Sequence, residues 1–167
     1  MTGVQTCALP IYWGYSLFSF EVYQGDVASE GLSDVHFIKL KLTDKTGRLV
    51  SDNFYWRGNK RKDYTALNTL PKVNLKVSYK TEKVNGKYII NAQITNPSSS
   101  NAVAFGIRVQ AVRSSTGEQI LPTIMNDNYF SLMNDESKAL RIEFDADVLG
   151  TDTPQLKVEP YNNRKRD

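Results

Sequence analysis

Apolar residues recur at every second position along much of the chain, and this period constrains the fold more than any other feature of the sequence. The period is clear in the segments 17–23, 38–43, 73–79, 88–94, 103–111, 140–144 and 156–158. Because successive side chains of a strand point to opposite faces, each segment predicts a strand with one face on a core and one in water. Segment 126–140 is less regular and leaves room for one short helical turn.

Polar turns separate these predicted strands. Asn85-Gly86 stands between two alternating runs and is the favoured pair for a type I′ hairpin, since both residues tolerate positive φ. Thr46-Gly47 and Thr116-Gly117 end two further turns, and segment 96–101 predicts a loop, because its proline cannot donate to a strand ladder. Closely spaced strands with no helices between them predict an all-β chain containing an immunoglobulin-like β-sandwich.

Two stretches, 39–56 and 108–130, share one layout of strand, Thr-Gly turn, second strand and Asp-Asn-aromatic segment. This weak repeat predicts two modules of similar construction in tandem. We expect the truncated end of a first β-sandwich over 12–58, a linker over 59–71, an immunoglobulin-like β-sandwich over 72–161 and a basic tail over 162–167.

The first eleven residues, MTGVQTCALPI, resemble a translated sequencing adapter. A short signal peptide is the alternative, but the segment lacks a basic n-region and a proper apolar h-region. On the adapter interpretation Cys7 lies outside the natural protein, and the natural chain begins further upstream. We therefore expect the first module to be incomplete and to expose an unpaired strand edge together with Phe18, Phe20 and Leu40.

Composition excludes several functional classes. One cysteine and one histidine allow no disulfide framework, no Cys/His zinc cage and no Ser-His-Asp triad that does not use His36. Apolar runs are too short for a membrane-spanning helix, and the net charge of +3 is not a nucleic-acid signature. We expect no cofactor, no metal, no nucleic-acid partner and no membrane partner.

Carboxylates and the histidine provide the first candidate site residues. Asp52 and Asp127 begin the two Asp-Asn-aromatic segments, where we expect them to accept backbone N–H groups in turns. Segment 145–152 is faintly similar to a calcium loop but lacks the closing Glu, which favours an ordinary loop between strands. His36 begins a predicted strand, and we expect it at the surface or at an edge.

Basic and aromatic residues provide the other candidates. The cluster Arg57, Lys60, Arg61 and Lys62 and the run 164–166 suit a solvated linker and tail, or a nucleic-acid module if stacking aromatics lie beside them. Trp13, Trp56 and the tyrosines suit core packing, or a sugar-stacking platform if they are exposed. Gly86-Lys87 belongs to the predicted hairpin and not to a phosphate-binding loop.

The segments 36–56, 70–75 and 120–137 together resemble the C-terminal part of glycoside hydrolase family two enzymes, in the branch of β-mannosidases and exo-β-D-glucosaminidases. The motifs are SDNFYW at 51–56, LPKV at 70–73 and DNYFSLM at 127–133, followed by Glu136. Asn134-Asp135 replaces the usual Pro-Gly of the family, and both residues tolerate the left-handed conformation that such a turn requires.

This resemblance, which covers 17–161, implies a parent with five domains whose two catalytic Glu residues lie on an upstream TIM barrel. It places no catalytic residue, cofactor or metal here and assigns no substrate-binding residue. It implies non-catalytic sandwiches that support the upstream barrel of the same chain during β-glycoside hydrolysis, in a secreted or periplasmic protein. The alternative is an autonomous carbohydrate-binding module that holds an oligosaccharide on exposed aromatics.

Overall fold

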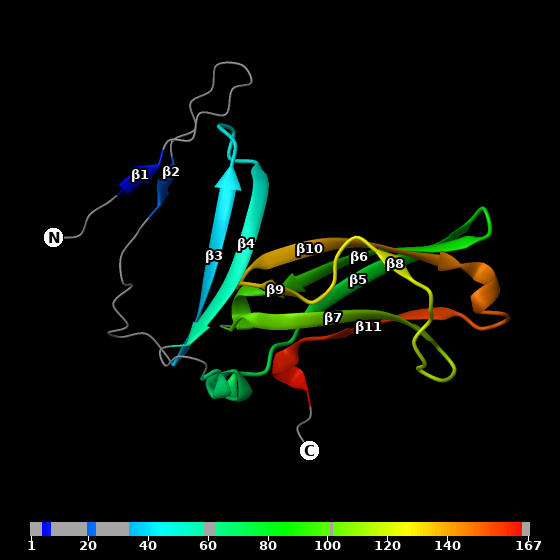
Figure 1. Ribbon diagram of the computed structural model, residues 1–167. Helices are drawn as coiled ribbons and strands as arrows, with labels where there is room; N and C mark the ends of the chain where they lie inside the picture. Colours follow the sequence, from blue (N-terminus) through cyan, green and yellow to red (C-terminus); the bar gives the residue numbers. More distant parts are fainter. Residues whose placement is uncertain (1–4, 8–19, 23–33, 59–62, 101, 165–167) are drawn as a thin grey trace.

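A computed structural model of the chain describes residues 5–7, 20–22, 34–58, 63–100 and 102–164. In these residues strands and short 3-10 turns make up the regular structure, which confirms the predicted all-β class (Figure 1). The strands are β1 (Gln5–Cys7), β2 (Phe20–Val22), β3 (Val35–Thr43), β4 (Leu49–Gly58), β5 (Lys76–Val84), β6 (Lys87–Asn96), β7 (Ala104–Arg113), β8 (Ile124–Met125), β9 (Phe130–Leu132), β10 (Glu136–Asp145) and β11 (Pro154–Glu159). The 3-10 turns are η1 (Thr65–Thr69), η2 (Ser98–Ser100), η3 (Ala146–Val148) and η4 (Tyr161–Asn163).

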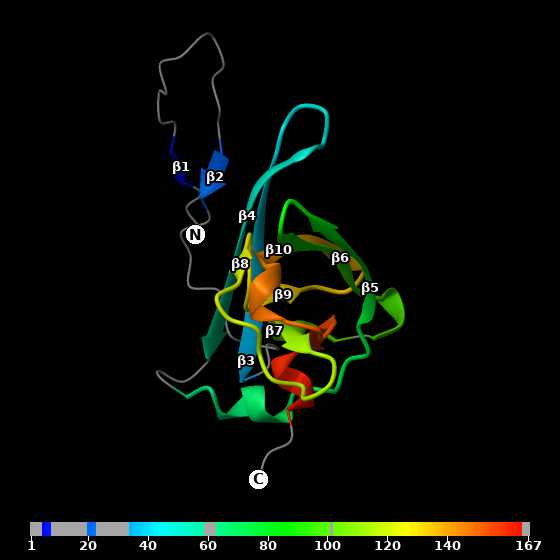
Figure 2. The ribbon, with the colours of Figure 1, turned by 90° about the vertical axis from the view of Figure 1, so that its right-hand side faces the viewer.

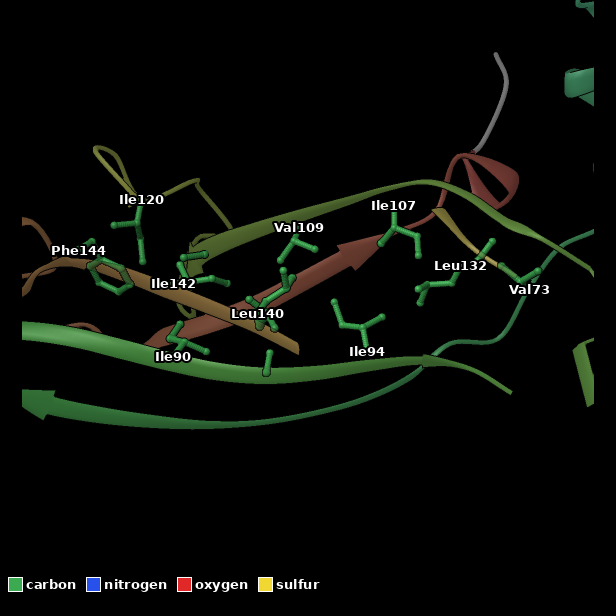
Figure 3. Close-up of a cluster of buried hydrophobic side chains, with 14 of the residues drawn as sticks. Val73, Ile90, Ile94, Ile107, Val109, Ile120, Leu132, Leu140, Ile142 and Phe144 are labelled. Carbon is green, nitrogen blue, oxygen red and sulfur yellow. The ribbon is translucent and has the colours of Figure 1, made fainter. Parts of the chain in front are cut away.

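Two antiparallel sheets pack face to face and form the predicted immunoglobulin-like sandwich. One sheet has the strand order β5-β6-β10-β8 and the other has the order β11-β7-β9. Alternate residues of β6, β7 and β10 point into the space between the sheets (Figure 3). The largest fully buried apolar side chains are those of Val73, Ile90, Ile94, Ile107, Val109, Ile120, Ile142 and Leu149.

The hairpin between β5 and β6 turns where the sequence predicts. Asn85 has φ of 49° and Gly86 has φ of 77°, the pair of positive values that a type I′ turn requires. From this turn Lys87 pairs with Val84, and the ladder continues to Lys76 opposite Thr95. Strand β5 begins three residues later than the alternation indicates, because the backbone of Val73 is bonded on both sides to Asn163.

Two buried asparagines hold the loops at one end of the sandwich. The Asn96 amide nitrogen donates to the carbonyls of Ala102 and Leu132, at 2.8 and 3.1 Å. The Asn162 amide nitrogen donates to the Pro71 carbonyl at 2.8 Å, and its oxygen accepts from the Phe105 N–H at 2.9 Å. These bonds satisfy buried backbone groups where the ladders stop, so the chain enters and leaves the sandwich at fixed places.

Strands β3 and β4 form a long two-stranded hairpin beside the sandwich (Figures 1 and 2). Within the described residues each pairs only with the other, so both edges are open there, as the sequence leads us to expect. Leu40 is 54% exposed, also as expected, whereas Phe18 and the side chain of Phe20 lie outside the described residues. The short strands β1 and β2 pair with each other, separately from this hairpin.

Segment 126–140 differs from expectation. It contains no helical turn but a loop, strand β9 and the first half of β10. The repeat is also imperfect, because Asp52 lies inside β4 whereas Asp127 lies in the loop before β9. A short alternating pattern cannot distinguish these two settings, since strand pairing depends on the rest of the sheet.

Candidate functional site

The hairpin and the sandwich enclose a groove of about 520 Å³. Lys39, Asp52 and Trp56 line it from the hairpin, and Phe105, Tyr129 and Glu136 line it from the sandwich. Residues 37, 39 and 41 of β3 share one face with 56, 54 and 52 of β4, because these residues pair directly across the hairpin. This shared face points at the sandwich and forms one wall of the groove.

Phe105 is the centre of an aromatic cluster that joins the hairpin to the sandwich. Its ring lies 5.4 Å from the rings of Phe37 and Trp56 and 5.8 Å from the ring of Tyr161. The ladder between β7 and β9 shifts register between Ala104 and Ile107, and Gly106 at this shift has φ of 52°. The positive φ suits glycine, and the shift turns Phe105 outward to the hairpin while Ala104 and Ile107 remain in the core.

An ion network lies beside the aromatic cluster. The Lys39 ammonium is 2.7 Å from a Glu136 carboxylate oxygen and 3.0 Å from an Asp52 oxygen, and the Lys41 ammonium is 2.6 Å from the other Glu136 oxygen. The Met133 N–H also donates to Glu136 at 2.9 Å. The network therefore ties both strands of the hairpin to the start of β10.

The pKa values of the network follow from these contacts. Burial alone would raise the pKa of Glu136, but hydrogen bonds from Lys39, Lys41 and the Met133 N–H outweigh it and hold this pKa below the usual value. Burial alone would lower the pKa of Lys39, but its bonds to Glu136 and Asp52 outweigh it and raise this pKa. Both groups are therefore charged across the neutral range.

The far wall of the groove is built by the loop before β9. The Asn128 side chain brackets the backbone of Val109, accepting from its N–H at 2.8 Å and donating to its carbonyl at 3.0 Å. Asn128 also accepts the Tyr129 N–H at 2.9 Å, and Tyr129 has φ of 56°. Asp127 accepts the Asn128 N–H, as expected for a turn, and pairs with Lys138 at 2.5 Å.

Asp52 and Glu136 are the two carboxylates that the network brings together, and their setting limits what they can do. A glycosidase pair needs one carboxyl group that remains protonated at the working pH, so that it can donate a proton to the leaving oxygen. Lys39 stands between Asp52 and Glu136, and the lowered pKa of Glu136 keeps that group ionised. The arrangement suits a structural network.

Asp52 does not accept backbone N–H groups in a turn, so that prediction is wrong. It lies inside β4, its cross-strand neighbour is Lys41, and its carboxylate pairs with Lys39. The sequence stretch DNF alone carries no sign of this pairing. Sequence reasoning also missed Lys39, Glu136 and Phe105 as functional residues, although the alternation already places 37, 39 and 41 on one face.

The calcium-like segment forms an ordinary loop, as predicted. Asp152 accepts the hydroxyls of Ser115 at 2.6 Å and Ser114 at 2.8 Å, and the Thr153 N–H at 2.7 Å. These bonds lower the pKa of Asp152 to about 2. In the part of the chain that the structure describes, no group of His, Cys, Asp and Glu side chains is placed to hold a metal ion.

His36 lies in β3, an edge strand among the described residues, which agrees with one of its two expected placements, but its ring is not at the surface. Its ring nitrogens are buried and have no hydrogen-bond partner among the described residues, and its cross-strand neighbour in the hairpin is Arg57. The surface prediction rested on the lack of a second metal ligand in the sequence. The absence of a second metal ligand does not indicate whether a side chain of β3 is buried.

The remaining basic and glycine candidates that the structure describes lie in separate elements. Arg57 lies in β4 and Arg164 follows η4, whereas residues 60–62, 165–166 and Trp13 lie outside the described residues. Gly86-Lys87 belongs to the hairpin between β5 and β6, as predicted. No helix in the described ranges has the length and apolar character needed to cross a membrane. Trp56 and Tyr129 are the candidate aromatics that the structure brings to the groove.

Comparison with known proteins gives a consistent result. Exo-beta-D-glucosaminidases of Arthroderma benhamiae and Amycolatopsis orientalis are 27% and 25% identical over 151 and 154 residues. These matches cover 80% and 81% of this chain but only 16% and 15% of the relatives' own length. The crystal structure of the A. orientalis exo-chitosanase CsxA superposes with a TM-score of 0.76 at 24% identity, over 86% of this chain and 19% of that one, which supports the fold.

The match to a family model identifies the family of this chain. The model describes the exo-beta-D-glucosaminidase Ig-fold domain and matches residues 53–163, which include β5 to β11 and most of β4. It confirms the exo-β-D-glucosaminidase branch of the resemblance seen in the sequence. The chain belongs to the exo-β-D-glucosaminidase Ig-fold domain family.

Proposed function

We propose that this chain is a non-catalytic accessory region of a family two glycoside hydrolase, which supports a catalytic barrel elsewhere in the same protein during hydrolysis of β-linked glycosides. An exo-β-D-glucosaminidase is the favoured parent, because the family model and both curated relatives carry that description. A β-mannosidase is the alternative parent. The proposal includes the expected secreted or periplasmic location of the whole enzyme.

The pairing of the groove carboxylates with lysines supports the proposal that this region is non-catalytic. Asp52 and Glu136 share the ammonium of Lys39, and the pKa of Glu136 is lowered where a general acid needs it raised. Asp127 is paired with Lys138. Each of these three carboxylates has a lysine ammonium partner, and the lowered pKa of Glu136 is the opposite of what a general acid requires.

Exposed apolar side chains on the outer face of the hairpin support the accessory role. Leu40, Leu42 and Tyr55 lie on the face opposite the groove and are 54%, 51% and 48% exposed. Adjacent exposed apolar side chains of this size are typical of a surface that packs on other protein. The chain spans about one sixth of the length of its curated relatives, so such a surface suits contact with the rest of a larger enzyme.

A turnover assay tests the proposal. The purified chain is incubated with aryl β-D-glucosaminide and with aryl β-D-mannoside, beside the variants Glu136→Gln and Asp52→Asn. We expect no release of the aryl group above the buffer rate for any of the three proteins. Release by the unmodified chain that either variant abolishes, with the fold intact by circular dichroism, would contradict the non-catalytic role.

A further inference from the structure

Two exposed aromatic rings meet at the groove from distant parts of the sequence. Trp56 on β4 is 48% exposed, Tyr129 before β9 is 61% exposed, and both line the same cavity of about 520 Å³. This volume lies within the range of about 300–1,000 Å³ that is typical of small-ligand sites. The groove therefore has a volume that suits a small ligand and two solvent-exposed aromatic rings on which a ligand can stack.

The Trp56 ring and the Tyr129 backbone are held in place before any ligand arrives. Trp56 packs on its edge against Phe105, with an interplanar angle of 76°. Tyr129 projects from a backbone with φ of 56°, which Asn128 fixes through its bonds to Val109 and to the Tyr129 N–H. Because the Trp56 ring and the Tyr129 backbone are already ordered, less conformational entropy is lost when a ligand stacks on these residues, so this wall is partly preorganised for binding.

The charges around the rings indicate which ligand fits. Lys39, Lys41 and Lys138 line the groove together with Asp52, Asp127 and Glu136, so lysines and carboxylates balance. Each of these carboxylates already has an ammonium partner at 3.0 Å or less. A balanced, internally paired groove offers neither sign of charge to an ionic ligand, and this favours an uncharged one.

Lys41 and Asp52 also keep capacity for further hydrogen bonds. Their side chains are 51% and 37% exposed, in contrast to 12% for Lys39 and 15% for Glu136. An ammonium has three donors and a carboxylate accepts several, so each can bind a hydroxyl without leaving its partner. Aromatic faces beside such donors and acceptors suit a molecule with an apolar C–H face and a rim of hydroxyls.

We propose that this groove binds an uncharged pyranose oligosaccharide, whose ring faces stack on Trp56 and Tyr129 while its hydroxyls bond to Lys41 and Asp52. This inference goes beyond the accessory role and does not depend on it, because it rests on the groove alone. An oligosaccharide of glucosamine, whose amines are cationic, binds more weakly than its neutral N-acetylated counterpart, since no carboxylate in the groove is unpaired.

Isothermal titration calorimetry on the whole chain tests the proposal with three probes: a β-1,4-linked glucose oligomer, an N-acetylglucosamine oligomer and a glucosamine oligomer of equal length. We expect at least one neutral oligomer to bind more tightly than the glucosamine oligomer, with an affinity that changes little with added salt. Absence of binding by both neutral oligomers, or salt-sensitive binding of the glucosamine oligomer alone, would overturn it.

Matched variants locate the binding. Trp56→Ala and Tyr129→Ala should each weaken the affinity by about tenfold or more, as loss of a central aromatic contact does. Tyr55→Ala removes a ring of equal exposure, 48%, from the opposite face of the same strand and should change the affinity by less than about twofold. Circular dichroism melting verifies each fold, and an equal loss in Tyr55→Ala would contradict the assigned groove. Turnover of aryl glycosides is a separate readout, so failure here leaves the accessory role to its own assay.

Discussion

The sandwich and the hairpin are built from the same alternating pattern but reach different states. In the sandwich, the apolar faces of β6, β7 and β10 meet across two sheets, and Ile90, Ile94 and Ile107 are fully buried. In the hairpin, Val35 is the buried apolar residue, while Leu40 and Leu42 remain half exposed. Alternation thus specifies a strand, but a second sheet is what turns its apolar face into a core.

The hairpin packs against the sandwich through one of its two faces. Phe105 meets its aromatic residues and Glu136 meets its lysines, so the hairpin depends on the sandwich for its order. The sandwich closes its own core from residues 73–156 and does not depend on the hairpin in this way. A two-stranded hairpin alone is at most marginally stable in water.

Truncation of a core side chain should cause the largest decrease in the free energy of unfolding. Ile94→Ala removes a fully buried side chain and should lower the free energy of unfolding by about 2–5 kcal/mol, because it leaves a cavity between the sheets. Leu42→Ala in the hairpin, where the side chain is half exposed, should cost less than about 1 kcal/mol. Urea denaturation followed by circular dichroism measures both, and equal losses would remove the distinction between the two regions.

Loss of a buried side-chain amide should cause the next largest decrease in the free energy of unfolding. Asn96→Ala leaves the carbonyls of Ala102 and Leu132 without that donor, at a cost of about 1–3 kcal/mol. Asn91→Ala, on the exposed face of the same strand, should stay within about 0.5 kcal/mol. The same denaturation experiment compares them. If the Asn96→Ala protein were as stable as the Asn91→Ala protein, the prediction would be wrong, and water would replace the lost donor at the carbonyls of Ala102 and Leu132.

Removal of Phe105 should separate the two regions. Phe105→Ala deletes the ring that Phe37 and Trp56 contact, so residues 35–58 should be cleaved several-fold faster in limited proteolysis while the sandwich persists. Tyr129→Ala removes an exposed ring that has no ring contact to the hairpin among the described residues and serves as the control. Unchanged cleavage in Phe105→Ala would mean that other contacts hold the hairpin.

The ion network should contribute least, and its contribution should depend on pH. Because the pKa of Glu136 is lowered from 4.5 in the folded chain, its stabilisation is present above about that pH and is lost as the pH falls through the folded value. The raised pKa of Lys39 makes its share present below 10.5 and lost at higher pH. Partial exposure limits the whole effect to about 1 kcal/mol or less.

Amide chemical shifts of the hairpin, recorded by NMR as the pH is lowered from neutral, test this prediction. The unmodified chain should show a transition below about pH 4.5 in the residues around Lys39 and Lys41. Glu136→Gln should lack that transition, because the amide does not titrate. An identical transition in both proteins would assign it to another carboxylate.

Alternation and turn residues were enough to predict most of the sandwich. The hairpin at Asn85-Gly86 and strands β6, β7, β10 and β11 follow directly from local pattern. Strands β8 and β9 did not, because they are two and three residues long and are defined by the partner strand. The start of β5 depends on Asn163, which lies 90 residues further along the chain.

The groove could not be predicted from the sequence, because its walls come from segments that local pattern does not connect. Lys39 and Glu136 are 97 residues apart, and Trp56 meets Phe105 only because Gly106 turns that ring outward. Composition did indicate that aromatic residues would either pack or bind sugar. Exposure of Trp56 and Tyr129 favours the second, and only the structure shows that they share one groove.

Hydrogen exchange of the whole chain, followed by mass spectrometry, tests most directly whether the sandwich is self-sufficient and the hairpin conditional. We expect the amides of β6, β7 and β10 to exchange only through global unfolding, while those of β3 and β4 exchange markedly faster through local opening. Protection of β3 and β4 as strong as that of β6 and β10 would contradict it.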